Sequence, residues 1–139
     1  LEGMATIEIL SADQALANLS NHKLGRIVMH SRDGLEIFPI NYVTDRINLY
    51  FRTAPGTKLS GIMTNSDVVF EVDHVEANEA WSVVVKGDAE QVRDYSEKCY
   101  IDTLDLTPWV PTRKQNYIRI TPREISGRSF RLSNQIERY

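Results

Sequence analysis

The sequence INLYFRTAPGTKLSGIM, residues 47–63, decides the fold that this chain is expected to adopt. Its first six residues alternate between more apolar and more polar side chains, which is the pattern of a half-buried β-strand. The alternation breaks at Ala54-Pro55-Gly56, and apolar residues then recur at helical spacing, at Leu59, Ile62 and Met63. We therefore predict a strand that leads through a glycine-containing turn into a short helix.

This strand–turn–helix segment is a candidate anion site. The first backbone N–H groups of a helix have no partner inside the helix, and they attract negative charge. Arg52 leaves the strand, Lys58 lies in the first helical turn, and Thr53 and Thr57 add hydroxyl groups, so we expect both cations to converge on a phosphate. The alternative is an ordinary solvated loop, because neither a P-loop nor a G-x-G-x-x-G motif is present.

Composition indicates an ordinary globular protein. The 139 residues are 42% hydrophobic and 25% charged, which predicts one domain over residues 4–139, with residues 1–3 read as a cloning remnant. The net charge of −3 argues against a general nucleic-acid or membrane surface. A single cysteine, Cys99, excludes an intrachain disulfide and fits a reducing compartment, so a cytoplasmic location is expected.

The rest of the chain predicts several strands and a few short helices. Two further helices are expected at 11–21, which opens with the capping box SADQ, and at 94–104. The other strands are predicted at 26–31, 35–43, 68–73, 80–86 with a bulged continuation past Gly87 over 89–92, 117–120 ended by Pro122, and 125–132. The first three strands are expected to form an antiparallel meander, and strands without a polar row favour a barrel.

No motif for metal binding or nucleophilic catalysis is apparent. His22, His30 and His74 lack the spacing of metal ligands, and no serine lies in a G-x-S-x-G context. Glu71 and Asp73 lie on one face of a predicted strand, where a solvated or cross-strand-paired row is a better interpretation than a catalytic carboxylate pair.

Six short segments in a fixed order carry a resemblance to a known family. They are FPINYV (38–43), YFRT (50–53), GTKL (56–59), FEVD (70–73), WSVVVKG (81–87) and ISGR (125–128). Together they resemble the pyridoxamine 5′-phosphate oxidase-like flavin-binding split-barrel superfamily, in particular its small actinobacterial and nitroimidazole-reductase-like branch, over residues 24–132. The resemblance implies an α+β, mostly β fold: a six- to seven-stranded antiparallel split β-barrel with a few short helices.

The resemblance also implies a homodimer with one FMN in each of two clefts at the subunit interface. The positions that match the phosphate-binding segment are Arg52, Thr53, Thr57 and Lys58, followed by Leu59. This assignment agrees with the anion site inferred from the residues themselves.

Two further segments match positions along the flavin ring. The strand whose backbone borders the isoalloxazine matches Phe38, Pro39, Ile40 and Asn41. Pro39 has no N–H group, so it marks a sheet edge or a bulge. Trp81 and Ser82 match the strand position that approaches the pyrimidine side of the ring.

The expected function is that of a flavin-dependent oxidoreductase acting on an unidentified small molecule. Vitamin-processing oxidases of the superfamily carry a longer C-terminal segment that binds the substrate phosphate, whereas only one short arginine-containing stretch, 125–131, is present here. This difference argues against pyridoxamine 5′-phosphate as the substrate. The alternatives are a deazaflavin-dependent reductase, a flavin- or heme-binding protein without turnover, and a ligand-free dimerisation barrel.

Overall fold

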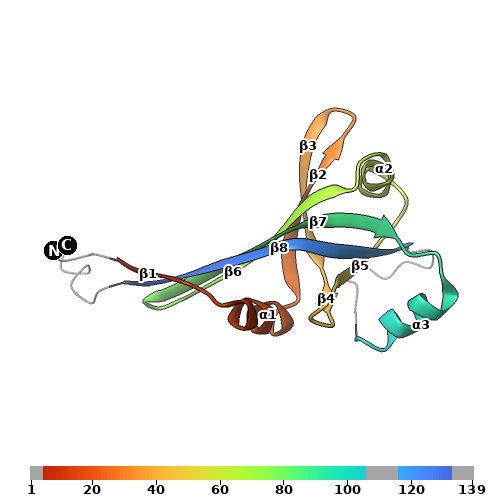
Figure 1. The fold of residues 1–139 in the computed structure, drawn as a ribbon. Coiled ribbons are helices and arrows are strands. Elements are labelled where there is room, and N and C mark those ends of the chain that lie inside the picture. Colours follow the sequence, from red (N-terminus) through yellow and green to blue (C-terminus); the bar gives the residue numbers. More distant parts are fainter. Residues whose placement is uncertain (1–4, 106–115, 133–139) are drawn as a thin grey trace.

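The computed structural model describes residues 5–105 and 116–132 (Figure 1). Its strands are β1 (Ala5–Ile9), β2 (Leu24–Ser31), β3 (Gly34–Asn41), β4 (Val43–Thr44), β5 (Leu49–Thr53), β6 (Asp67–Glu76), β7 (Glu79–Gln91) and β8 (Asn116–Leu132). Its helices are α1 (Ala12–Ser20), α2 (Thr57–Thr64) and α3 (Tyr95–Asp102). The mostly β character predicted from the sequence is confirmed, and none of the helices in these two ranges is long and apolar enough to span a membrane.

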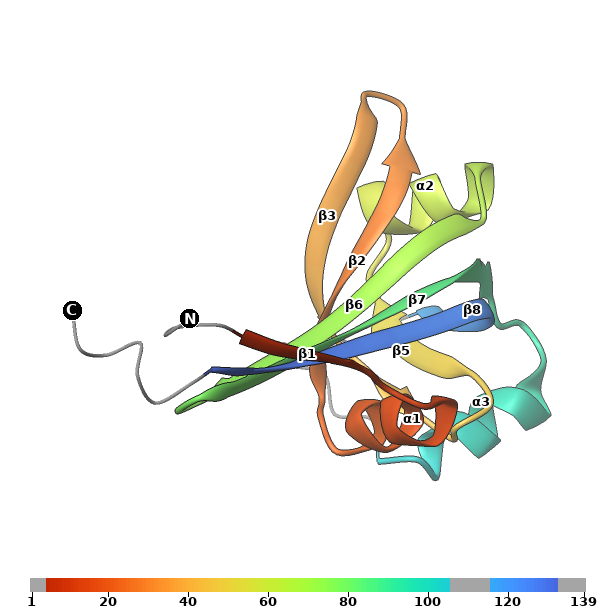
Figure 2. The ribbon, with the colours of Figure 1, turned by 60° about the vertical axis from the view of Figure 1, so that its left-hand side comes forward.

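The strands form one antiparallel sheet in the order β3-β2-β6-β7-β8-β5-β4, with β1 paired to β8. The two ends of this order, β3 and β4, are separated in the chain by Tyr42 alone, so the backbone itself closes the sheet into a split barrel. Tyr42 is buried there, and its hydroxyl donates a hydrogen bond of 2.6 Å to the Leu19 carbonyl oxygen. Figures 1 and 2 show β6, β7 and β8 running out from the barrel as one long ribbon.

The predicted meander is present only in part. β2 and β3 pair from Ser31 and Gly34 onward, as the Asp-Gly turn indicates. The second predicted strand is interrupted at Tyr42, so only β4 pairs with β5 on one side, and β8 pairs with β5 on the other. The chain passes from one end of the strand order to the other at Tyr42, and the long strand β8 supplies the second partner for β5. This pairing is remote in sequence, so local turn signals could not reveal it.

The last two predicted strands are one continuous strand, β8, which passes through Pro122. Pro122 lies opposite Gly87, where the β7–β8 register shifts, so the missing proline N–H falls at an irregular point of the ladder. The predicted continuation of the strand past Gly87 is confirmed, but the additional residue at this irregular point, Arg123, lies in β8 and not in β7. A side chain at Gly87 would collide with the Thr121 carbonyl oxygen, which explains why glycine stands there. β1 was not predicted, and it pairs with β8 at the other end of the described chain.

The core fills the barrel and is covered by the helices. Its largest fully buried side chains include Phe51, Phe70, Ile27, Met29 and Ile120. Figure 2 shows α2 beside the β2–β3 hairpin and α1 on the opposite side of the barrel. A smaller apolar cluster of Tyr50, Val92 and Ile101 lies under α3, on the other face of β5 from the main core. The predicted α1 capping box between Ser11 and Gln14 is present.

Candidate functional site

The start of α2 has no side-chain cap. β5 ends at Thr53, the chain turns through Ala54-Pro55-Gly56, and Gly56 takes the N-cap position with a φ of 157°. A φ in this range suits glycine, because a Cβ would be strained there. Glycine supplies no side-chain oxygen for the first helical N–H groups, so these amides stay available for an external acceptor.

Lys58 lies in the first turn of α2 and carries a charge that no described residue neutralises. Its ammonium group lies over the Phe38 ring, with Nζ 5.2 Å from the ring centroid. It forms no ion pair with any residue in the described ranges, and partial burial lowers its pKa below the ordinary value of 10.5. A half-buried ammonium without a partner is costly, and an incoming anion would relieve that cost.

The structure does not bring Arg52 and Lys58 together as the sequence suggested. Side chains alternate along a strand, so Arg52 shares the face of Tyr50 and points toward α3. Its guanidinium donates to Asp102 Oδ1 at 2.9 Å and lies 4.9 Å from the Tyr117 ring centroid. The buried Nε of Arg52 has no acceptor among the described residues. Arg52 as a phosphate ligand stays a prediction, and Asp102 would compete for the same guanidinium.

The Arg52–Asp102 pair is expected to hold α3 against β5 and β8. Asp102 Oδ1 also accepts a hydrogen bond of 2.6 Å from the Tyr117 hydroxyl. Because both charged side chains are partly exposed, we expect a coupling energy of about 0.5–1 kcal/mol between Arg52→Ala and Asp102→Asn. Urea unfolding of the two single variants and the double variant measures it. Additive effects would show that the pair does not stabilise α3.

The remaining residues of the phosphate-binding segment differ in exposure. Thr57 is exposed at the first position of α2, where its hydroxyl can reach an anion. Thr53 is buried, and its hydroxyl donates to the neighbouring Ala54 carbonyl oxygen at 3.2 Å. Leu59 packs against the core, so it anchors the helix. Lys58 and Thr57 are therefore the two side chains that the start of α2 presents most directly.

The segment predicted to border the flavin ring is part of β3, at one end of the sheet order. Phe38 and Ile40 pack toward the core, whereas Pro39 is exposed and lies opposite Arg26. The edge position predicted from Pro39 is confirmed. Asn41, the last residue of β3, is half-buried.

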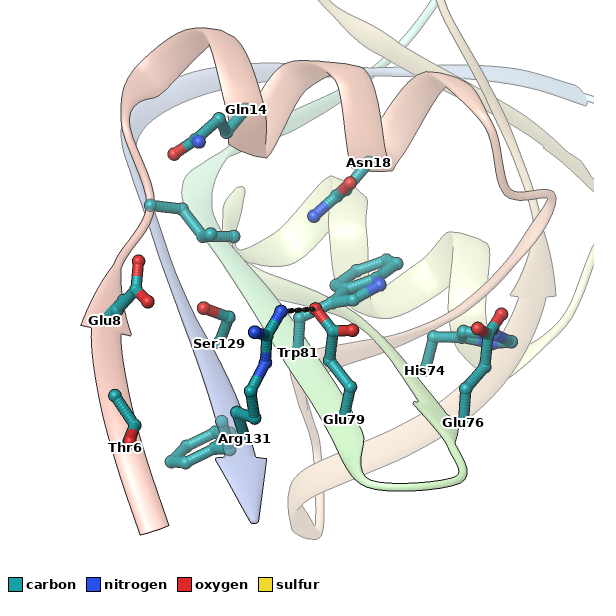
Figure 3. Close-up of a pocket in the computed structure, with 12 residues that line it drawn as sticks. Thr6, Glu8, Gln14, Asn18, His74, Glu76, Glu79, Trp81, Ser129 and Arg131 are labelled. Atoms are coloured by element: carbon teal, nitrogen blue, oxygen red, sulfur yellow. Dashed lines mark hydrogen bonds and ion pairs between the residues drawn. The ribbon is translucent and has the colours of Figure 1, made fainter. Parts of the chain in front are cut away.

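Trp81 and Ser82 are adjacent in β7 and therefore face opposite sides of the sheet. Trp81 lies on the core side, where it lines a pocket of about 420 Å³ beneath α1 (Figure 3). Ser82 lies on the outer side, opposite Asp73 in register. One ligand on a single face of the sheet cannot contact both side chains. Their assignment as flavin contacts stays a prediction.

The outer face of the sheet carries the paired row that the sequence suggested. Arg26 donates from Nε and Nη2 to Glu71 Oε1, at 2.8 and 2.6 Å, and its Nη2 lies 3.2 Å from Asp73 Oδ1. Burial and the neighbouring Asp73 raise the pKa of Glu71, while Arg26 acts in the opposite direction. The interpretation of Glu71 and Asp73 as a cross-strand-paired row is confirmed.

The aromatic surroundings of Trp81 were not foreseen. The rings of His22 and Trp81 meet edge to face, with centroids 4.9 Å apart. The ring centroids of His22 and His74 are 5.1 Å apart. His22 follows α1, His74 belongs to β6 and Trp81 to β7. Three elements bring these residues together, so no sequence spacing could have indicated the cluster.

Comparisons with known proteins agree on one family. A family model described as pyridoxamine 5′-phosphate oxidase matches residues 11–129. The structure of a candidate pyridoxamine 5′-phosphate oxidase from Corynebacterium glutamicum is similar, with 47% identity and a TM-score of 0.83 over 92% of this chain and 96% of that one. An FAD binding protein from Mycobacterium smegmatis shows 39% identity and a TM-score of 0.79, covering 91% of this chain and all 100% of its own. An uncharacterized protein of Mycobacterium tuberculosis is 36% identical over 88 residues, which are 63% of this chain and 80% of that protein.

Proposed function

This chain belongs to the pyridoxamine 5′-phosphate oxidase family, and from that premise we propose that it is a flavin-dependent oxidoreductase whose flavin phosphate binds at the start of α2. Lys58 carries this proposal. It is a half-buried ammonium with no counter-ion among the residues that the structure describes, and it stands beside helix N–H groups that no side chain caps. A phosphate would supply the missing negative charge and accept those hydrogen bonds.

The residues present fit a flavin in other respects. When bound, a flavin supplies hydride and electron transfer, and the protein contributes binding, orientation and exclusion of water. Lys58 and Thr57 would hold the phosphate, and the open edge of β3 at Pro39 would lie along the ring. The relative from Mycobacterium smegmatis, described as an FAD binding protein, supports a flavin as the cofactor.

We further propose a homodimer in which a second copy covers the outer face of β3. Leu35 and Ile37 are 68% and 61% exposed, and they lie on the same face of β3 as Pro39. Large apolar side chains beside a candidate cofactor edge favour a subunit interface there. Sedimentation equilibrium should give twice the chain mass of 15.9 kDa. A mass of one chain at micromolar concentration would overturn the proposed dimer.

A comparison of FMN, FAD and riboflavin tests the proposed cofactor site. We expect saturable quenching of FMN or FAD fluorescence at about one flavin per chain, and at least tenfold weaker binding of riboflavin. Riboflavin lacks the phosphate, and a charge-assisted contact contributes about 1.5–3 kcal/mol. Equal affinities for FMN and riboflavin would show that the phosphate does not bind at α2.

The affinity for FMN is also expected to depend on pH. Because burial lowers the pKa of Lys58, this lysine loses its charge at a lower pH than an ordinary lysine. The affinity should therefore fall as the pH rises through the lowered pKa of Lys58, at a lower pH than for an ordinary lysine, because the ammonium becomes neutral. FMN titrations of the Lys58→Met variant at the same pH values provide the control, since ionisation of the flavin itself affects both proteins alike. A parallel decline in the two proteins would exclude Lys58 as the titrating group.

A further inference from the structure

The pocket beneath α1 is a second candidate site, separate from the start of α2. Its floor is a cross-strand row in which Glu8, Ser129, Trp81 and His74 stand side by side on β1, β8, β7 and β6. Gln14 and Asn18 of α1 form the wall above this floor (Figure 3). The volume of about 420 Å³ lies within the range of small-molecule sites. No residue of α2 lines this pocket.

Trp81 provides a fixed aromatic surface in this pocket. His22 packs against it edge to face, and the His74 ring centroid lies 6.2 Å from that of the indole. Trp81 also packs against the main core, so its ring has little freedom to turn away. Within the described ranges its indole N–H donates to no acceptor. An indole face held in this way is the best aromatic partner for a cation.

The charges around the pocket are predominantly negative. Arg131 and His74 are its basic residues, and each faces a carboxylate: Arg131 Nη2 lies 3.8 Å from Glu79 Oε1, and His74 Nε2 lies 2.8 Å from Glu76 Oε1. Glu8 has no ion-pair partner among the residues that the structure describes. The Asn18 amide points into the same space (Figure 3). An anion would therefore be repelled here, in contrast to the start of α2.

We propose that this pocket binds a small organic cation with a flat ring. The ring would lie against Trp81, and the ammonium group would lie toward Ser129 and Glu8. β1 and β7 flank β8, so Glu8 and Trp81 are two strand spacings apart, or roughly 10 Å. An arylalkylamine, in which a short chain separates the ring from the amine, has the length to span them. This inference goes beyond the proposed flavin function and does not depend on it.

Three probes of similar shape and different charge test this inference. They are 2-phenylethylamine, 2-phenylethanol and 3-phenylpropionate. The Trp109→Phe variant leaves Trp81 as the only tryptophan, so its emission reports on the pocket. We expect 2-phenylethylamine to cause a saturable change in the fluorescence of Trp81. The alcohol and the carboxylate should bind at least tenfold more weakly. Binding of 3-phenylpropionate as tight as that of the amine, or no saturable response to the amine, would overturn the proposal.

Substitution of Glu8 tests the position of the ammonium group. Glu8 is exposed, so Glu8→Gln should leave the fold intact. The same substitution should lower the affinity for 2-phenylethylamine at least threefold. Glu124→Gln is the matched control, because Glu124 is an exposed carboxylate of β8 that lies outside the pocket and loses the same charge. An equal effect of the two substitutions would show that only the net charge matters, and it would refute the site.

Discussion

The Lys58→Met variant is expected to bind FMN at least tenfold more weakly than the unaltered protein. Loss of one charge-assisted hydrogen bond costs about 1.5–3 kcal/mol, and each 1.4 kcal/mol is about a factor of ten in affinity. Methionine keeps an apolar stem that can still pack against the Phe38 ring, so the change removes the charge with little loss of packing. Fluorescence titration of FMN at constant ionic strength measures the effect.

Lys86→Met is the matched control for this prediction. Lys86 is an exposed lysine of β7, whereas Lys58 is half-buried, and the Nζ of Lys86 lies 3.8 Å from Glu124 Oε2. Its substitution should leave the FMN affinity within a factor of about two, since exposed ion pairs contribute little. In the Lys58→Met protein, the preference for FMN over riboflavin should shrink by the same factor as the FMN affinity, because Thr57 and the helix N–H groups remain. An undiminished preference for FMN would assign the phosphate to another residue, with Arg52 the next candidate.

The Gly61→Ala variant is expected to lower the free energy of unfolding by about 1–3 kcal/mol, because overpacking forces neighbouring groups apart. Gly61 is where α2 packs directly on β2, and a Cβ there would collide with the His30 carbonyl oxygen and the Met29 side chain. On helix propensity alone, glycine to alanine would instead stabilise a helix by about 0.5–1 kcal/mol. The sign of the change therefore decides between the two effects.

Urea unfolding of Gly61→Ala and of Ser60→Ala makes the comparison. Ser60 is exposed on the same helix, so alanine there changes propensity without a collision. A stabilised Gly61→Ala protein would mean that α2 can move away from β2 at little cost. If α2 moves, its first turn moves with it, so FMN binding should weaken in Gly61→Ala and remain unchanged in Ser60→Ala.

The sequence predicted local features well and distant pairing poorly. The α1 capping box, the Asp-Gly hairpin and the helix after Gly56 each depend on residues close together in the chain. The continuation of β8 through Pro122 depends on the register shift between β7 and β8 at Gly87, which is a property of both strands. The expectation that proline ends a strand considers one segment alone, so it could not show that β8 continues through Pro122.

The candidate site shows the same division. The start of α2 with Lys58 and Thr57 was found from a local pattern, and the structure keeps both at the start of the helix. The expected convergence of Arg52 stays a prediction, because its guanidinium donates to Asp102 in the described structure. The strand pattern already contained the signal for this orientation. Arg52 stands two residues after Tyr50, so both face α3. What lies on that face is decided by α3, some 50 residues later in the sequence.

The single strand β8 has a consequence for the order in which this protein can be assembled. It pairs with β7 on one side and with β5 and β1 on the other. β5 and β1 therefore cannot join the rest of the sheet through β8 until residues 116–132 are present. A nascent chain that has released only β1 to β7 can form its hairpins but cannot complete the barrel. The pairing of Ala5 with Leu132 brings together residues from opposite ends of the described chain, which gives the fold a high contact order. Barrels with such non-local pairing fold in milliseconds to seconds, so barrel closure should follow synthesis of β8.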